Sequence, residues 1–181
     1  MEYVYHVVTD RPMQVGQKIV FDENNRSGVY RRVMEKLPLV EEIYAHPENY
    51  DAQTLEHHTS VAMRELALED VRREQFGDLP SRMGCLYASF SLEEAENWAK
   101  LFADLGRPTY HIVKLAVEKH FIADACNCFR AALDEATNRK KALRYWQNLP
   151  NEEGREPIRE LLVSGDITVL EIVKEINANI G

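Results

Sequence analysis

The sequence predicts one α+β domain over residues 1–181, with short, mostly antiparallel strands and a large helical insertion after the first strand. Three observations predict this fold class. An apolar, β-branched run opens the chain, apolar residues recur at helical spacing between residues 27 and 76, and further β-branched runs follow residue 85. A chain of 181 residues is long enough to form a core and to enclose a small-molecule cleft.

The first strand is predicted within "VYHVVTD", residues 4–10, because β-branched and aromatic residues there precede a polar stop. Alternation along a strand places His6 on the same face as Val4 and Val8. The plain structural interpretation of His6 is a half-buried histidine that is hydrogen-bonded to a backbone carbonyl. Gly16, within residues 13–21, then predicts a turn or bulge before a short extended segment.

Three helices are predicted between residues 27 and 76. The first stops before Pro38 and the second before Pro47, because the residue that precedes a proline disfavours the helical conformation. The third is predicted over residues 52–76. Its apolar side carries Leu55, Thr59, Ala62, Met63 and Leu66.

A strand over residues 85–90, "CLYASF", leads directly into a helix. Ser91 and Glu94 form a capping-box pattern at the start of that helix. The stripe that faces the core comprises Leu92, Ala95, Trp98, Ala99 and Phe102. Tyr87 and Ser89 therefore lie on a strand that feeds a capped helix.

The second half of the chain alternates strand and helix signals. Strands are predicted over residues 109–117 and 120–124, and a helix over residues 128–147. The residues expected to face inward on that helix are Phe129, Ala132, Leu133, Ala136, Leu143 and Trp146. An apolar run at 161–163, a turn at 164–166 and a last strand from Ile167 complete the pattern.

Composition and charge restrict the partners. The chain is 45% hydrophobic and 29% charged, with a formal net charge of -8. Its acidic residues are spread over the helical segments, and it has no dense cluster of Lys and Arg that would bind phosphates, so nucleic acid is not the expected partner. No apolar segment is long enough to span a membrane, so we expect no membrane association. The oligomeric state does not follow from the sequence.

The three cysteines are Cys85, Cys126 and Cys128, in a sequence without a signal-peptide pattern. An odd number of cysteines in such a chain is typical of the reducing cytoplasm, so we expect a cytoplasmic protein. Cys126 and Cys128 form a C-x-C pair, whose spacing suits neither a common zinc site nor a disulfide. We therefore expect reduced thiols and no bound metal.

Three separated motifs resemble the His-Tyr-Glu branch of the ADP-ribosyltransferase-like superfamily. "YHVVTD" with His6 is similar to the first strand of that superfamily, "LYAS" with Tyr87 to its tyrosine strand, and "RELLVSGDI" with Glu160 to its glutamate segment. The chain also resembles a bacterial family of unknown function. The resemblance implies an ADP-ribosyltransferase-like fold and a cleft for NAD, which would be the substrate.

The resemblance also implies a role for each of the three residues. The residue that matches His6 holds the adenosine-side ribose, the residue that matches Tyr87 stacks on the nicotinamide, and the residue that matches Glu160 bonds the nicotinamide ribose. The chemistry agrees with these roles. A carboxylate stabilises the oxocarbenium-like cation that forms when an N-glycosidic bond breaks, and an aromatic face attracts the cationic nicotinamide ring.

Three further polar residues are candidates for the cofactor site. Arg82, in the turn before the tyrosine strand, could bind the pyrophosphate through two parallel bonds. Thr9 and Ser89 could line the cleft. Each candidate also has a plain structural alternative: Tyr87 could pack on Trp98, Glu160 could be an exposed carboxylate, and Arg82 could be a surface residue.

The leading hypothesis is an NAD-binding enzyme, either a transferase with an unidentified acceptor or an NAD glycohydrolase. Ile158 stands two residues before Glu160, where many protein-modifying relatives carry a Glu or Gln that orients the acceptor, so transfer to an arginine side chain is disfavoured. One alternative is a catalytically inactive binding module on the same fold. Another is an RNA 2′-phosphotransferase-like enzyme, which the lack of a basic patch disfavours.

Overall fold

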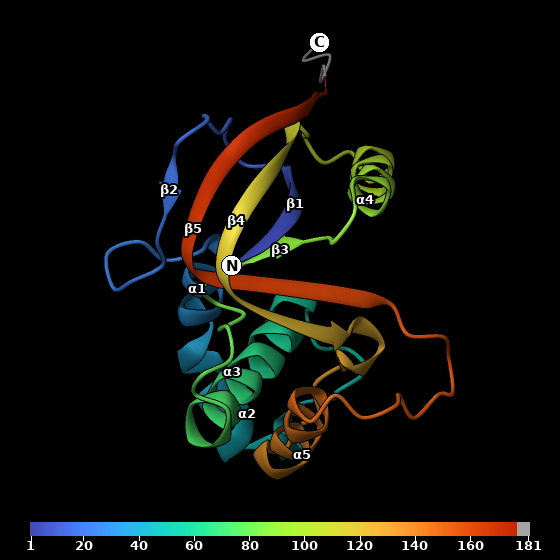
Figure 1. Cartoon of the computed structure of the whole chain (residues 1–181). Helices are drawn as coiled ribbons and strands as arrows, with labels where there is room; N and C mark the ends of the chain where they lie inside the picture. Colours follow the sequence, from blue (N-terminus) through green and yellow to red (C-terminus); the bar gives the residue numbers. More distant parts are fainter. Residues whose placement is uncertain (177–181) are drawn as a thin grey trace. The chain divides into compact units, whose positions relative to one another are not determined.

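The computed structural model describes residues 1–176. Within these residues it shows a mixed α/β chain with five α-helices and a five-stranded antiparallel sheet (Figure 1), which confirms the predicted combination of helices with antiparallel strands. The contacts divide the chain into two compact units. Unit 1 comprises residues 1–21, 86–121 and those from 160 onward, and unit 2 comprises residues 22–85 and 122–159.

The sheet belongs to unit 1, except for the ends of two strands. Its order is β1–β4–β5–β2, and β3 also pairs with β5. The strands are β1 Glu2–Val8, β2 Lys18–Ile19, β3 Leu86–Ala88, β4 His111–Asp124 and β5 Arg159–Glu175. The main chain of Tyr5 on β1 pairs with Ser89, just after β3, through two 2.8 Å hydrogen bonds. The run of pairings β1–β4–β5–β3 therefore returns to β1 at this bridge.

Strands β4 and β5 are longer than predicted. The two strands expected over 109–117 and 120–124 form one strand, and β5 continues through the turn expected at 164–166. Gly165 has a φ of 74°, a conformation that favours glycine, and the Asp166 N–H donates to the Glu118 carboxylate at 3.0 Å. Figure 1 shows β5 turning partway along its length, so the turn signal in the sequence marks a bend within a strand.

Two apolar clusters stabilise unit 1. We call the first the sheet core: Val4, Val8, Val113, Leu115, Val117, Leu161, Val163, Ile167 and Val169. The second lies under α4 (Leu92–Asp104) and joins Ala95 and Ala99 to Val7 on β1. As predicted, Ser91 caps α4, because its side chain accepts the Glu94 N–H at 3.1 Å.

Unit 2 is mainly helical. Its helices are α1 Gly28–Glu35, α2 Leu37–Ala45, α3 His57–Gln75 and α5 Glu135–Trp146, with short 3₁₀ turns at Pro47–Asn49 and Ala125–Asn127. One buried cluster of unit 2 comprises Val33, Val40, Ile43, Ala62, Met63, Met83 and Ala131. Within residues 1–176, no helix combines the length and the apolar character needed to cross a bilayer.

Two helices of unit 2 begin later than predicted because a side chain caps them. Helix α3 starts at His57, after the Glu56 carboxylate, which accepts two backbone N–H groups of the first turn. Helix α5 starts at Glu135, after Asp134, which accepts the Thr137 N–H at 2.8 Å. Ala136 lies in the first turn of α5 on the side away from the buried Asn138 and is exposed, so the prediction that it faces inward was wrong. The buried residues of α5 are Asn138, Ala142, Tyr145 and Trp146.

Candidate functional site

Five of the six predicted site residues lie in unit 1. His6 is on β1, Tyr87 on β3 and Glu160 near the start of β5. Thr9 follows β1 and is half-buried, and Ser89 follows β3 and is buried. Arg82, the sixth, belongs to unit 2.

The His6 ring contacts the tyrosine strand through its main chain. Nδ1 of His6 lies 2.6 Å from the carbonyl oxygen of Tyr87. Because a carbonyl oxygen can only accept, Nδ1 carries the proton and donates it. Desolvation lowers the pKa of His6, the bond to Tyr87 opposes this, and the charges of Arg107 and His111 lower it further. His6 is therefore neutral at pH 7, and the interpretation of a half-buried histidine bonded to a backbone carbonyl is confirmed.

The pairing of β3 with β5 brings Tyr87 and Glu160 together. Tyr87 lies directly opposite Leu162. Its neighbours Leu86 and Ala88 pack against the sheet core, so Tyr87 and Leu162 project from the other face. Glu160 precedes Leu162 by two residues and projects from that same face. Tyr87 and Glu160 are thus diagonal neighbours on adjacent strands. Their Cα atoms are about 7 to 8 Å apart, so their side chains can reach each other.

At Tyr87 and Glu160 this face of the sheet can be reached from solvent. The Tyr87 residue is 38% exposed and Glu160 is half-buried. Ser89, two residues after Tyr87, continues the same face and is held by its two main-chain bonds to Tyr5. An accessible aromatic ring beside a carboxylate suits a flat cationic ring whose attached carbon develops positive charge.

The side chain of His6 lies on the opposite face of the sheet from Tyr87 and Glu160. Tyr5 faces the same side as Ser89 across their bridge, so its neighbour His6 projects to the other side, as Val4 does toward the sheet core. The NAD cleft that the resemblance implies would bring all three side chains together, and this expectation was wrong, because only Tyr87 and Glu160 share a face. Of the contacts described above, the one that links His6 to this pair is its hydrogen bond to the backbone carbonyl of Tyr87.

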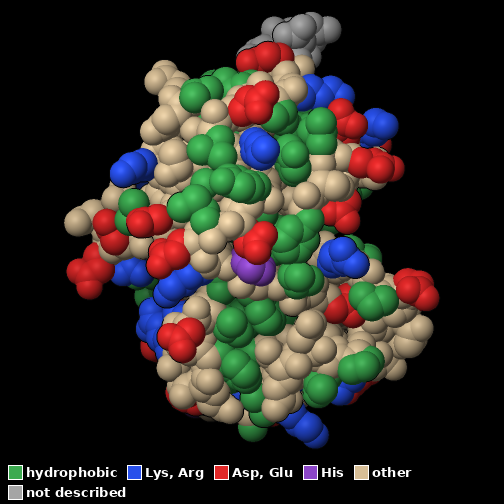
Figure 2. Space-filling view, viewed as in Figure 1, with side chains coloured by type: hydrophobic (Ala, Val, Ile, Leu, Met, Phe, Trp, Pro, Cys, Tyr) green, Lys and Arg blue, Asp and Glu red, His purple; other side chains and the backbone are tan. Residues whose placement is uncertain are grey.

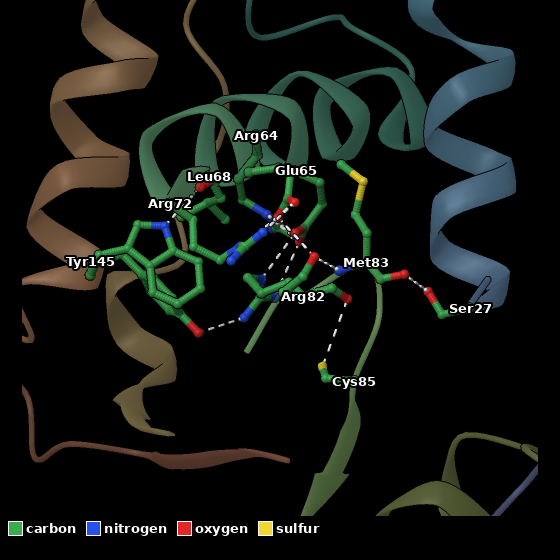
Figure 3. Close-up of polar contacts among 12 residues, drawn as sticks. Ser27, Arg64, Glu65, Leu68, Arg72, Arg82, Met83, Cys85 and Tyr145 are labelled. Atoms are coloured by element: carbon green, nitrogen blue, oxygen red, sulfur yellow. Dashed lines mark hydrogen bonds and ion pairs between the residues drawn. The ribbon is translucent and has the colours of Figure 1, made fainter. Parts of the chain in front are cut away.

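Arg82 is part of a buried ion-pair network in unit 2 (Figure 3). Its Nε and Nη2 donate to the two carboxylate oxygens of Glu65 at 2.9 and 3.1 Å, and its Nη1 donates to the Tyr145 hydroxyl at 2.7 Å. Burial alone would raise the pKa of Glu65, but Arg82 and Arg64 lower it. A pyrophosphate could bind Arg82 only if these bonds broke. The geometry therefore favours a structural role for Arg82 over the predicted cofactor contact.

Two buried glutamates and one buried histidine were not predicted from the sequence. Glu65 and Glu69 are 3% and 7% exposed on α3, although their charge suggested a solvent-facing side. Glu69 binds Arg72 and the Ser81 hydroxyl. The only sequence signal was their spacing of four residues among apolar neighbours. His111 was also missed, since its surroundings depend on strand pairing.

The three cysteines and one groove lie in unit 2. Within residues 1–176, no disulfide joins Cys85, Cys126 or Cys128. No group of three or more His, Cys, Asp or Glu side chains within residues 1–176 is arranged to hold a metal ion. A groove of about 290 Å³ lies in unit 2, and its lining includes Leu39, Ile43, Tyr50, Leu55 and Glu56 but none of the predicted site residues. On the face shown in Figure 2, Lys and Arg are scattered among Asp and Glu.

Comparison with known proteins adds a family. A family model described as "Protein of unknown function (DUF2441)" matches residues 4–175. No curated protein matches the sequence. Every predicted site residue lies within the matched range. The chain belongs to this family of proteins of unknown function, DUF2441.

Proposed function

We propose that the chain has an ADP-ribosyltransferase-like activity: it binds NAD on the face that carries Tyr87 and Glu160, and it cleaves the bond between nicotinamide and ribose. One structural observation supports this proposal above the others. The β3–β5 register gives an accessible aromatic ring and a carboxylate as diagonal neighbours on one face. The resemblance of the three sequence motifs to the His-Tyr-Glu branch supplies the reaction.

The proposed chemistry uses both side chains. Tyr87 stacks on the cationic nicotinamide ring, which fixes the ring beside the sheet. As the glycosidic C–N bond breaks, its electron pair passes to the ring nitrogen, and nicotinamide leaves as a neutral molecule. The ribose carbon becomes oxocarbenium-like and the Glu160 carboxylate stabilises that charge. Water or another acceptor then attacks the same carbon and loses a proton.

The remaining candidates have supporting roles in this proposal. His6 donates to the carbonyl of Tyr87 and so holds the tyrosine strand from the opposite face. Thr9 and Ser89 are polar liners at the ends of β1 and β3. Ile158 is 52% exposed and offers no group that could orient a basic acceptor, so an arginine side chain is not the proposed acceptor.

A test needs binding and turnover measured separately. We expect Glu160→Gln to keep NAD binding and to slow nicotinamide release by about two to three orders of magnitude, since a preorganised group of this kind is worth about 3 to 4 kcal/mol. Tyr87→Ala should instead weaken NAD binding in calorimetric titration, because stacking acts before the bond breaks. Matched controls are Glu171→Gln, an exposed carboxylate on β5, and Tyr3→Ala, an exposed tyrosine on β1. Absence of both NAD binding and nicotinamide release in the wild type would refute the proposal.

The second candidate is a non-catalytic binding module. The observation that favours it is the position of the His6 side chain on the opposite face from Tyr87 and Glu160, which leaves the resemblance incomplete in space. A wild-type protein that binds NAD but never releases nicotinamide would support this candidate. Equal turnover in wild type and Glu160→Gln would instead show that another residue carries the charge.

A further inference from the structure

A buried histidine outside the proposed reaction holds the loop that follows β1. His111 is the first residue of β4, lies directly opposite Val8 and is 4% exposed. Its Nε2 is 3.0 Å from the backbone N of Met13, in the loop formed by residues 9–17 between β1 and β2. Its Nδ1 is 3.5 Å from the carboxylate of Glu175 on β5.

The contacts of His111 define its protonation state. A backbone N–H can only donate, so Nε2 must accept from Met13 through its lone pair. The ring proton is then on Nδ1, which faces the Glu175 carboxylate. Addition of a second proton at Nε2 would set two donors against each other in a buried position, where an unsatisfied donor is costly. The bond to Met13 therefore exists only with the neutral ring.

The other end of the same loop is held by groups that do not titrate. The Gly16 N–H donates to the Val169 carbonyl at 2.8 Å, and the Val169 N–H donates to the Gln17 carbonyl at 2.9 Å. The half of the loop nearer β1, which begins with Thr9, is bonded to β4 through His111. Protonation of His111 would therefore loosen this half and leave the Gly16 end paired.

We propose that His111 is a positioning residue that holds residues 9–13 against the sheet in its neutral form and releases them on acidification. We further infer that this release displaces Thr9 and so weakens NAD binding; this second step rests on the proposed function. Within residues 1–176, the Glu175 carboxylate faces the ring and favours the added proton, and His6, whose charge interacts with that of His111, would oppose it.

The test first measures the loop without NAD. Nitrogen-15 NMR of the ring should show the Nδ1–H tautomer at about pH 7.5. Amide exchange at Met13, corrected for its intrinsic pH dependence, should quicken about tenfold or more by about pH 5.5, while exchange at Tyr5 on β1 should not change. His111→Gln offers a side-chain oxygen that accepts at any pH, so it should keep Met13 protected throughout. His111→Leu removes the acceptor and should leave Met13 unprotected at both pH values.

NAD titration then separates the two parts of the inference. The NAD dissociation constant of the wild type should rise with acidification, in parallel with Met13 exchange, and that of His111→Gln should not. An Nε2–H tautomer at neutral pH, or the same pH response in His111→Gln as in the wild type, would overturn the positioning role. A pH-dependent loop with a pH-independent NAD affinity would overturn the link to binding. A pH-dependent loop in a protein that binds no NAD would uphold the switch and refute the proposed function instead.

Discussion

Replacing Arg82 with Met would show whether this residue stabilises the fold or binds a cofactor. The substitution leaves Glu65, 3% exposed, without its main partner, and it removes the bond that Arg82 donates to the Tyr145 hydroxyl. Removing one partner of a buried ion pair costs about 3 to 5 kcal/mol. Arg64 still lies 3.0 Å from the Glu65 carboxylate, so we expect the lower value, about 3 kcal/mol. For a chain of this length the Tm should fall by about 6 to 12 °C.

Thermal unfolding followed by circular dichroism measures this loss. Arg26→Met, at an exposed arginine of the same unit, is the matched control and should change the Tm little. Replacing both Arg82 and Glu65 with Met should recover much of the stability, because no uncompensated charge then remains buried. A loss below about 1 kcal/mol for Arg82→Met, together with weaker NAD binding, would refute the structural role and restore the pyrophosphate contact.

The pH dependence gives a second check on the same ion pair. Because the pKa of Glu65 is lowered in the folded state, the ion pair contributes its full stability at pH values above the ordinary pKa of glutamate, about 4.3. That stability is lost as the pH falls through the lowered pKa. In Arg82→Met the buried carboxyl can take up a proton more readily, so the deficit relative to wild type should shrink on acidification. A deficit that is constant between neutral and acidic pH would contradict this assignment.

Three further substitutions test individual contacts. Gly165→Ala should destabilise unit 1 by about 2 to 4 kcal/mol in denaturant titration, because the φ of Gly165 is 74° and the new Cβ would lie 3.1 Å from Cβ of Glu118. Gly16→Ala is the control: its φ is 85° but its Cβ would meet open space, so it should cost about 1 to 2 kcal/mol. Equal losses would contradict the predicted clash. Hydrogen bonds from the first turn of α3 hold the pKa of Glu56 at about 2, so its carboxylate is a charged cap. Glu56→Gln should therefore lower the Tm above about pH 5, and the difference in Tm from the wild type should disappear toward pH 2. A difference that does not depend on pH would argue against a charged cap. Ser91→Ala should cost about 1 kcal/mol, measured by the same titration, and no loss would mean that the cap contributes little.

Local sequence signals predicted the elements and much of what surrounds His6. The alternation in β1, the proline stops and the Ser91 cap depend on neighbours within a few residues, and such neighbours are visible in sequence. The start of helix α5 was predicted too early, because the apolar residues from 128 onward were assigned to the helix and the Asp134 cap was not recognised. Gly165 shows a different limit. A glycine with positive φ serves a tight turn and a strand bend equally, and only the partner strand decides which one forms.

The candidate site depended on pairings that sequence alone does not contain. Tyr87 and Glu160 become neighbours through the β3–β5 register, and a shift of one residue would have put them on different faces. His6 was correctly expected on the face of Val4 and Val8, but the relation of that face to Tyr87 required the Tyr5–Ser89 bridge. Arg82 lies two residues after Pro80 in a predicted turn, and such a position is typical of a surface residue. Its burial depends on a carboxylate of α3, a different element.

The division into two units has a consequence for how this protein can be cut or inherited. The chain passes from one unit to the other at residues 21/22, 85/86, 121/122 and 159/160, so neither unit is a continuous stretch of sequence. Neither could be gained or lost in a single gene insertion, and a stop codon anywhere before residue 160 would remove strand β5. A protease that nicks the 147–158 loop would leave two fragments that both units need. We expect such a nicked protein to remain one particle in native gel filtration and to separate only in denaturant.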